Sequence, residues 1–258
     1  MDEHPPILRN APLRIVAVEL RFPDTVLLPE DLKKIRKALA KEYPISDTEQ
    51  GIGFEISLQA GVRQQTTMQR HVYKSRNGSH QVGLTSTALV LEARADYEGF
   101  QHFLTRWLAM LEVVEPILDL DTQLRLGLRY VNQLVVEDPS PGLEAVVGRI
   151  NPTLLAPFQT EGFEHAITSS FQELRLSKET HKGSLRHGLQ VAQEGSPPQG
   201  IYLLDIDFYD DELVDYDNEK QKESLKLFNS EIWKIFRWSI TDDEFARMEP
   251  EDRDDSAS

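Results

Sequence analysis

The pattern of apolar and polar positions is similar in two halves of the chain. An apolar, strand-like run at residues 13–22 (LRIVAVELRF) has a counterpart at residues 124–133 (LRLGLRYVNQ), about 110 residues later. The segments that follow each run match in kind and order. Because a sheet must bury its apolar face against another element, the pattern predicts two similar halves that share one core. We expect the halves to comprise residues 1–118 and 119–248, in one joint structural unit.

The pattern in the first half predicts a strand, a helix, four further strands and a long helix. Pro29 followed by two acidic residues is typical of a helix start. Asn77 and Gly78 stand between two strand-like runs and predict a hairpin. Asp96 suits the cap of the second helix, where apolar residues recur at steps of three and four. The strands are predicted at residues 13–22, 53–60, 68–75, 80–85 and 88–95.

The pattern in the second half predicts the same order of elements. Ser140 and Pro141 suit the cap and first turn of a short helix, and a last helix is predicted at residues 217–238. Residues 249–258 are acidic and lack aromatic side chains, so we expect a disordered tail there. The strands are predicted at residues 124–136, 163–176, 184–193 and 201–209.

Together these elements predict an α+β fold. Two similar β-α-β(3-4)-α halves would form a continuous curved antiparallel sheet with helices packed on one face and the other face open. This order of elements resembles the duplicated saddle fold of the TATA-box-binding protein and of relatives that reuse it without DNA. A helix-grip barrel is the alternative architecture.

Four short signatures resemble a known family. They stand at residues 12–23 (PLRIVAVELRFP), 126–132 (LGLRYVN), 204–209 (LDIDFY) and 236–241 (FRWSIT). In this order, and across nearly the whole chain, they are similar to a sporadically distributed, uncharacterised bacterial protein family of about the same length. The resemblance implies a single structural unit, a bacterial source and an accessory role of the kind encoded on mobile-element or phage-defence loci. It implies no catalytic residues.

Composition and charge narrow the classes of function. Of the 258 residues, 40% are hydrophobic and 28% charged, as in soluble globular proteins. A formal net charge of −15 disfavours specific nucleic-acid binding and anionic membranes. The lack of cysteine excludes disulfides, thiolate catalysis and cysteine-based zinc sites. The sequence has neither a signal peptide nor an apolar run of membrane-spanning length, so we expect a cytoplasmic protein. It has no cofactor-binding motif, so we expect no cofactor.

Asp205 and Asp207 are the sharpest candidates for chemistry. They alternate with apolar residues, so both carboxylates are expected on one face of a strand. Two carboxylates so placed can hold a divalent metal ion with help from other residues, as in metal-dependent hydrolases and nucleases. A solvated sheet face that leads to a helix cap is the alternative interpretation.

Arg125, Arg129 and Asn132 are candidate binding residues on the strand that opens the second half. Arg125 and Arg129 share one face of this strand, as Glu19 and Arg21 do in the corresponding strand of the first half. If the two strands meet, these charges form either a structural ion-pair network or a polar patch that binds a carboxylate or phosphate.

A basic cluster surrounds the predicted hairpin, and Arg70, Lys74 and Arg76 are its candidate binding residues. No glycine-rich phosphate loop or RNA-binding signature accompanies it. The cluster therefore predicts either an exposed hairpin that balances an acidic protein or a docking surface for an acidic partner. The histidines are scattered, although His165 and His187 could meet across neighbouring strands.

These observations favour a non-catalytic module that binds another protein or a peptide, in a bacterial accessory system such as phage defence. A homo-oligomer is compatible with the pattern. The alternative is a metal-dependent hydrolase or nuclease that uses Asp205 and Asp207. A third hypothesis, acidic mimicry of nucleic acid, requires charges displayed in regular rows.

Overall fold

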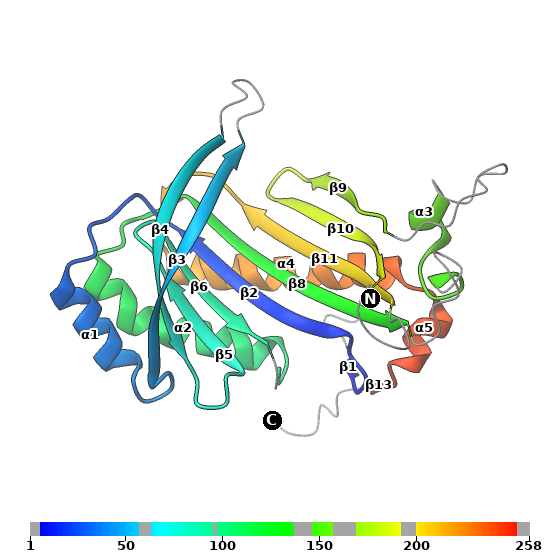
Figure 1. Cartoon of the computed structure of the whole chain (residues 1–258), viewed down its shortest axis with the longest axis horizontal. Coiled ribbons are helices and arrows are strands. Elements are labelled where there is room, and N and C mark those ends of the chain that lie inside the picture. Colours follow the sequence, from blue (N-terminus) through cyan, green and yellow to red (C-terminus); the bar gives the residue numbers. More distant parts are fainter. Residues whose placement is uncertain are drawn as a thin grey trace. The chain divides into compact units, whose positions relative to one another are not determined.

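The computed structural model has an α+β fold built on one large antiparallel sheet (Figure 1). It describes residues 6–56, 63–94, 97–136, 146–156, 169–191 and 200–251. Nine strands of this part of the chain form the sheet, in the order β3-β4-β5-β6-β2-β8-β11-β10-β9. The α+β class and the large antiparallel sheet confirm the prediction from the sequence pattern.

The sheet contains both short and long strands. Their bounds are Leu13–Arg21 (β2), Ile45–Ile56 (β3), Arg63–Lys74 (β4), His80–Leu84 (β5), Ala88–Ala93 (β6), Arg125–Val136 (β8), Gln172–Ser177 (β9), Lys182–Val191 (β10) and Gly200–Asp210 (β11). Two pairs of very short strands lie outside this sheet. They are Ile7–Leu8 (β1) with Pro250–Glu251 (β13), and Thr122–Gln123 (β7) with Val214–Asp215 (β12).

Five helices fall within the described residues, and most begin with a recognisable signal. Their bounds are Pro29–Leu39 (α1), Phe100–Leu118 (α2), Pro152–Leu155 (α3), Asn218–Ser239 (α4) and Asp242–Arg247 (α5). Pro29 opens α1 as predicted, with Glu30 and Asp31 near the positive end of the helix dipole. The Thr241 side chain caps α5 by accepting a hydrogen bond from the Glu244 backbone N–H at 3.2 Å.

The chain divides into two compact units. Unit 1 comprises Met1–Val16, Gly127–Asp210 and Glu223–Ser258, and unit 2 comprises Ala17–Leu126 and Asp211–Lys222. The division falls within β2, β8 and the first turn of α4, so each of these elements contributes residues to both units. Each unit thus draws on both predicted halves, and the internal duplication itself stays a prediction.

Unit 2 has its core between strands and the helix α2. Val18 and Leu20 of β2 and Trp107 and Leu111 of α2 are fully buried, because each element turns its apolar positions to one side. Figure 1 shows α1 alongside α2 in this unit. The predicted hairpin is confirmed: β4 and β5 pair in antiparallel fashion, and Gly78 adopts the left-handed φ of +72° in the turn between them.

Unit 1 packs the helix α4 against its strands, and Figure 1 shows α4 behind β8, β11 and β10. Tyr202, Leu204, Ile206 and Phe208 of β11 are almost fully buried and alternate with residues of the opposite face. Phe228 of α4 is equally buried on the helical side of this core. Alternation in the strand and helical periodicity in α4 therefore meet in one apolar layer.

Several bounds differ from those expected. β3 begins at Ile45, whereas the sequence pattern predicted a start at residue 53. The pattern missed the first part of this strand because its residues are polar and show no apolar alternation. That segment is a strand because it pairs with β4 at every position from Ile45 to Ile56. α2 is preceded by Gly99, while Asp96, its predicted cap, and most of the helix predicted after Ser140 lie outside the described residues. Pro250 and Glu251, in the expected tail, form β13.

Candidate functional site

The sheet of unit 1 has one face toward α4 and an opposite face, here called the open face, from which Asp205 and Asp207 project. Tyr130 on β8 points toward α4, because its hydroxyl donates to Asn229 Oδ1 at 2.8 Å. Arg129, next to it in β8, therefore projects from the open face. On β10, Arg186 lies opposite Asp205 in the register of the two strands. Basic and acidic side chains of different strands thus share this face.

A row of alternating charges crosses the open face of unit 1 from β8 to β9. Nε and Nη2 of Arg129 each donate to a carboxylate oxygen of Asp205 at 2.7 Å. Nη1 of Arg186 donates to Asp205 Oδ2 at 3.3 Å, and Nε of Arg186 donates to Glu173 Oε1 at 3.4 Å. Arg175 approaches Glu173 at 3.6 Å. The row thus contains three arginines and two carboxylates, and we call it the charge row.

Asp205 is the anchor of the charge row. Only 3% of this residue is exposed, although it lies on the open face, and two guanidinium groups bind its carboxylate. A buried carboxylate requires such charged hydrogen bonds, because its desolvation would otherwise be costly. Arg129 and Arg186 keep 46% and 33% of their side chains exposed. The structure therefore fixes the carboxylate inside and presents the arginines to solvent.

Arg125 belongs to unit 2 and forms its own ion pair. Its Nη1 donates to Glu19 Oε1 at 2.9 Å, and Arg21 Nε donates to the same oxygen at 2.6 Å. The backbone N–H of Leu124 donates to the carbonyl of Arg21, so the strands that carry these residues are adjacent, as the ion-pair hypothesis required. This arrangement is the cross-strand network that was one of the two predicted alternatives.

Asn132 does not join the arginines. Only 4% of it is exposed, and its Nδ2 donates to the Leu204 carbonyl at 3.4 Å. Its position in β8 has the parity of Tyr130, so it lies on the face toward α4, opposite to Arg129. Its polar atoms stabilise the contact between two strands instead of lining a surface.

Two basic side chains of the hairpin in unit 2 form ion pairs with carboxylates of other strands. Arg70 Nη2 donates to Glu92 Oε1 at 2.7 Å, and Lys74 lies 3.5 Å from Glu49. Gln81 Nε2 donates to the other oxygen of Glu92 at 2.7 Å. Arg76 is exposed at the turn that follows β4. Of the three predicted binding residues, Arg70 and Lys74 are therefore engaged by neighbouring carboxylates of the sheet.

Asp205 and Asp207 lie on one strand face as expected, but the surroundings of Asp205 are cationic. Arg129 and Arg186 donate hydrogen bonds to both oxygens of its carboxylate, so these oxygens are already bound by cationic groups. Ser184 and not a carboxylate or histidine lies opposite Asp207 in β10. Within the described residues, no group of three or more His, Asp or Glu side chains is placed to hold a metal ion.

A buried histidine–tyrosine pair lies on the other side of the same strands. His187 Nδ1 and the Tyr202 hydroxyl are 2.8 Å apart, and both residues are about 1% exposed. Burial lowers the pKa of His187 and raises the pKa of Tyr202, so both side chains are held neutral. His187 Nε2 is buried without a hydrogen-bond partner among the described residues. His165, the predicted neighbour of His187, lies outside the described residues.

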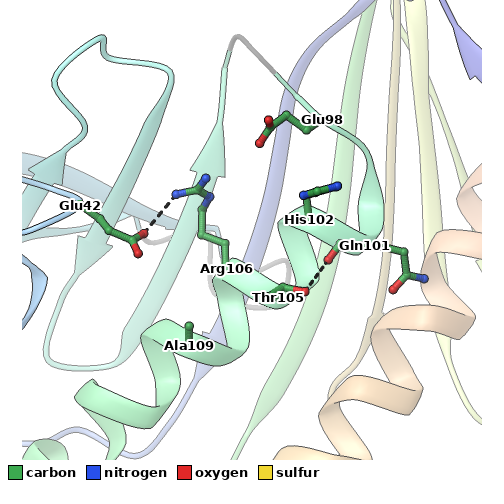
Figure 2. A pocket seen from close by; sticks show the side chains of 7 residues that line it. All are labelled: Glu42, Glu98, Gln101, His102, Thr105, Arg106 and Ala109. Atoms are coloured by element: carbon green, nitrogen blue, oxygen red, sulfur yellow. Dashed lines mark hydrogen bonds and ion pairs between the residues drawn. The ribbon is translucent and has the colours of Figure 1, made fainter. Parts of the chain in front are cut away.

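A groove of about 430 Å³ lies beside the first turns of α2 in unit 2 (Figure 2). Nη1 of Arg106 donates to Glu42 Oε2 at 3.1 Å across it, and Thr105 Oγ1 donates to the Gln101 carbonyl at 2.9 Å. The groove is lined by Glu42, Glu98, Gln101, His102, Thr105, Arg106 and Ala109. These side chains are mostly exposed, and they form no hydrogen-bonded nucleophile and base.

Sequence reasoning found Arg129 and Asp205 but not their relationship, and it missed Arg186 and Glu173. Arg186 alternates with the buried Leu185 and His187, which indicates that it is on the other face of its strand. The register that brings it opposite Asp205 has no signal in the sequence.

No described helix combines the length and hydrophobicity needed to cross a membrane. No protein-family model matches the chain, and no curated protein shows significant similarity to it.

Proposed function

We propose that the protein is a non-catalytic binding module that engages an acidic segment of a partner protein or peptide through the open face of unit 1. The charge row is the observation that carries this proposal. It presents the guanidinium groups of Arg129 on β8, Arg186 on β10 and Arg175 on β9. Guanidinium groups bind carboxylates through paired, charge-assisted hydrogen bonds, so acidic side chains are the ligands that suit this face.

The open face of unit 1 is much less acidic than the chain as a whole. The row has three arginines and two carboxylates and Asp207 adds a third carboxylate to the same face, whereas the chain has a formal net charge of −15. At physiological ionic strength, charges farther apart than about 8 Å are largely screened from one another. A docked acidic segment would therefore interact chiefly with the row, while the overall field disfavours nucleic acid and other extended anions.

Arg186 is the residue we expect to contact the partner. Its guanidinium has five N–H donors, and the row uses Nε for Glu173 and one donor of Nη1 for Asp205. The side chain is 33% exposed and held at two points, so little conformational entropy would be lost on binding. Arg175, which is 81% exposed, can supply further donors at the rim.

The same contacts weigh against the alternative of a metal-dependent hydrolase that uses Asp205 and Asp207. A metal ion at Asp205 would have to displace Arg129 and Arg186 or lie beside their positive charges. The carboxylate is better explained as the group that orients two arginines. This role requires no catalysis.

The wider context of the chain is part of the proposal. The resemblance of four signatures to a bacterial family supports an accessory role, for example in phage defence. The similar order β2-α1-β3-β4-β5-β6-α2 and β8-α3-β9-β10-β11-α4 supports an internal duplication with a saddle-like sheet. Helices packed on one face would leave the other face available for a partner.

Affinity capture with matched variants tests the proposal. Tagged wild-type protein, Arg186→Ala and Lys37→Ala would be used to capture proteins from bacterial lysate at moderate salt. Lys37 is an exposed residue of α1 in unit 2, so its variant makes the same change of charge on another surface. We expect a stoichiometric partner with the wild type and Lys37→Ala and its loss with Arg186→Ala. A partner retained equally by all three proteins would contradict the assignment to the open face.

A further inference from the structure

We propose that β9 pairs with β9 of a second copy of this chain, so that two copies join edge to edge into a homodimer. β9 stands last in the strand order of the sheet, and among the described strands it pairs with β10 alone. An exposed sheet edge presents N–H and C=O groups that can template another strand. Phe171 and Leu174 add exposed apolar side chains at this edge, 64% and 39% exposed respectively. This contact is made by the outer edge of β9, although its side chains Glu173 and Arg175 also belong to the charge row.

The hydrogen bonds at both ends of β9 show which of its backbone groups point outward. Lys178 N–H donates to the His181 carbonyl, and Ser170 N–H donates to the Leu189 carbonyl. In an antiparallel pair, hydrogen-bonded positions recur at every second residue. Gln172, Leu174 and Leu176 therefore bond to β10, whereas the N–H and C=O groups of Glu173, Arg175 and Ser177 point away from it.

This orientation restricts how two copies of β9 can pair about a twofold axis. Residues whose backbone groups point outward must lie opposite one another. The twofold axis therefore lies midway between the two copies of a single residue, and not between successive residues of the strand. With the axis at Leu174, Glu173 lies opposite Arg175 of the second copy, and Arg175 lies opposite its Glu173. Both pairs exchange backbone hydrogen bonds. The two Leu174 side chains then form a non-hydrogen-bonded pair, the type in which side chains approach most closely.

The charges of β9 select this register over its neighbours. An axis at Glu173 would place two carboxylates directly opposite each other, and an axis at Arg175 would place two guanidinium groups opposite each other. An axis at Gln172 or Leu176, nearer the ends of β9, would leave fewer residues in register. The axis at Leu174 alone gives two opposite-charge pairs and a central apolar pair. The strand is therefore complementary to itself.

Charge reversal tests this register. Glu173→Arg and Arg175→Glu each place like charges opposite in both pairs, so each variant alone should dissociate, with a dissociation constant at least about tenfold higher than that of the wild type. In an equimolar mixture, the Glu173→Arg chain contributes two positive charges and the Arg175→Glu chain two negative charges, so both opposite-charge pairs are restored. Arg76→Glu, at the exposed turn after β4 in unit 2, is the control with the same change of charge as Arg175→Glu.

The readout is the molar mass of the full chain, measured by light scattering during size exclusion over a wide range of concentrations. We expect twice the mass of one chain for the wild type, for Arg76→Glu and for the mixture, and the mass of one chain for each β9 variant alone. A wild type with the mass of one chain at every concentration would overturn the proposal. So would dimers of Arg175→Glu, whose side chain is 81% exposed and pairs with Glu173, or a mixture of folded variants that stays monomeric.

Discussion

Arg129 on β8 binds both carboxylate oxygens of Asp205 on β11, through two hydrogen bonds of 2.7 Å. The two residues are 76 positions apart in the chain, and the aspartate is buried while the arginine remains half exposed. Paired hydrogen bonds of this kind fix both the distance and the orientation of the two groups. This contact therefore determines how the arginines of the charge row are presented on the open face of unit 1.

Replacing Arg129 by Ala should lower the free energy of unfolding by about 1 to 3 kcal/mol, because the buried carboxylate of Asp205 loses its strongest partner. Arg186 still binds Asp205, and Arg129 is partly exposed, which keeps the loss below that of a fully buried pair. Urea unfolding measures the change. Lys34→Ala, which breaks an exposed ion pair of similar length with Asp31, is the control and should change stability far less. Equal losses of unfolding free energy in the two variants would show that the pair of Arg129 with Asp205 contributes no more to stability than an exposed ion pair.

Truncation of the core residues Trp107 or Phe228 to Ala should cost about 3 to 5 kcal/mol, as large core truncations do. Trp107 of α2 and Phe228 of α4 are 0% and 1% exposed. The matched control is Trp238→Ala, because this tryptophan of α4 is 43% exposed. A urea midpoint that is unchanged in Trp107→Ala would mean that α2 presents a different face to the sheet.

Gly188→Ala should destabilise unit 1 by about 1 to 3 kcal/mol. A Cβ atom at Gly188 would lie 1.9 Å from the carbonyl oxygen of Ser170, a backbone atom held by hydrogen bonds between Ser170 and Leu189. The comparison is Gly183→Ala, where the Cβ atom would meet the ring of Phe208, a side chain that can rotate. Thermal unfolding of both variants measures the difference, and a smaller loss in Gly188→Ala than in Gly183→Ala would contradict the close approach of residue 170.

Stability should fall in acid, partly because of His187. Burial lowers the pKa of His187 in the folded state, whereas the unfolded chain binds a proton near the ordinary value of 6.5. The unfolded state therefore holds more protons below pH 6.5, and the stability present above that pH is lost as the pH falls toward the folded-state pKa. The slope for one such group approaches about 1.4 kcal/mol per pH unit.

Urea midpoints measured between neutral pH and pH 5 test this origin. His187→Gln should show a shallower dependence on pH than the wild type, because residue 187 no longer titrates. His102→Gln, a substitution of an exposed histidine of α2, should keep the dependence of the wild type. An identical slope in His187→Gln and the wild type would assign the acid sensitivity to other groups, such as His71, whose pKa burial also lowers.

Mg²⁺ or Mn²⁺ should leave the melting temperature unchanged, because Arg129 and Arg186 surround the carboxylate of Asp205. A ligand that binds only the folded state raises this temperature, by an amount that grows with the ligand concentration relative to its dissociation constant. Melting with and without each ion, in the wild type and in Asp207→Ala, is the measurement. A rise of the melting temperature in the wild type that Asp207→Ala abolishes would support the alternative function, a metal-dependent hydrolase.

The local pattern of the sequence predicts elements whose two sides differ in polarity. β5, β6, β10 and β11 lie within two residues of their predicted bounds, and α4 within one, because apolar alternation or helical periodicity marks their buried faces. The first part of β3 could not be predicted, because it is polar and is held as a strand by its pairing with β4. For the same reason the pairs of β1 with β13 and β7 with β12 have no signal of their own.

The sequence by itself determined the class of fold, the hairpin at Gly78 and the placement of Asp205 and Asp207 on one strand face, because each follows from conformational preferences within a few residues. Only the tertiary structure decided that Asp205 meets Arg129 and Arg186, that Asn132 faces the core, and that Glu173 and Arg175 stand on an outer edge. These relationships depend on strand order and register between distant segments, and side-chain alternation within a strand is compatible with many pairings.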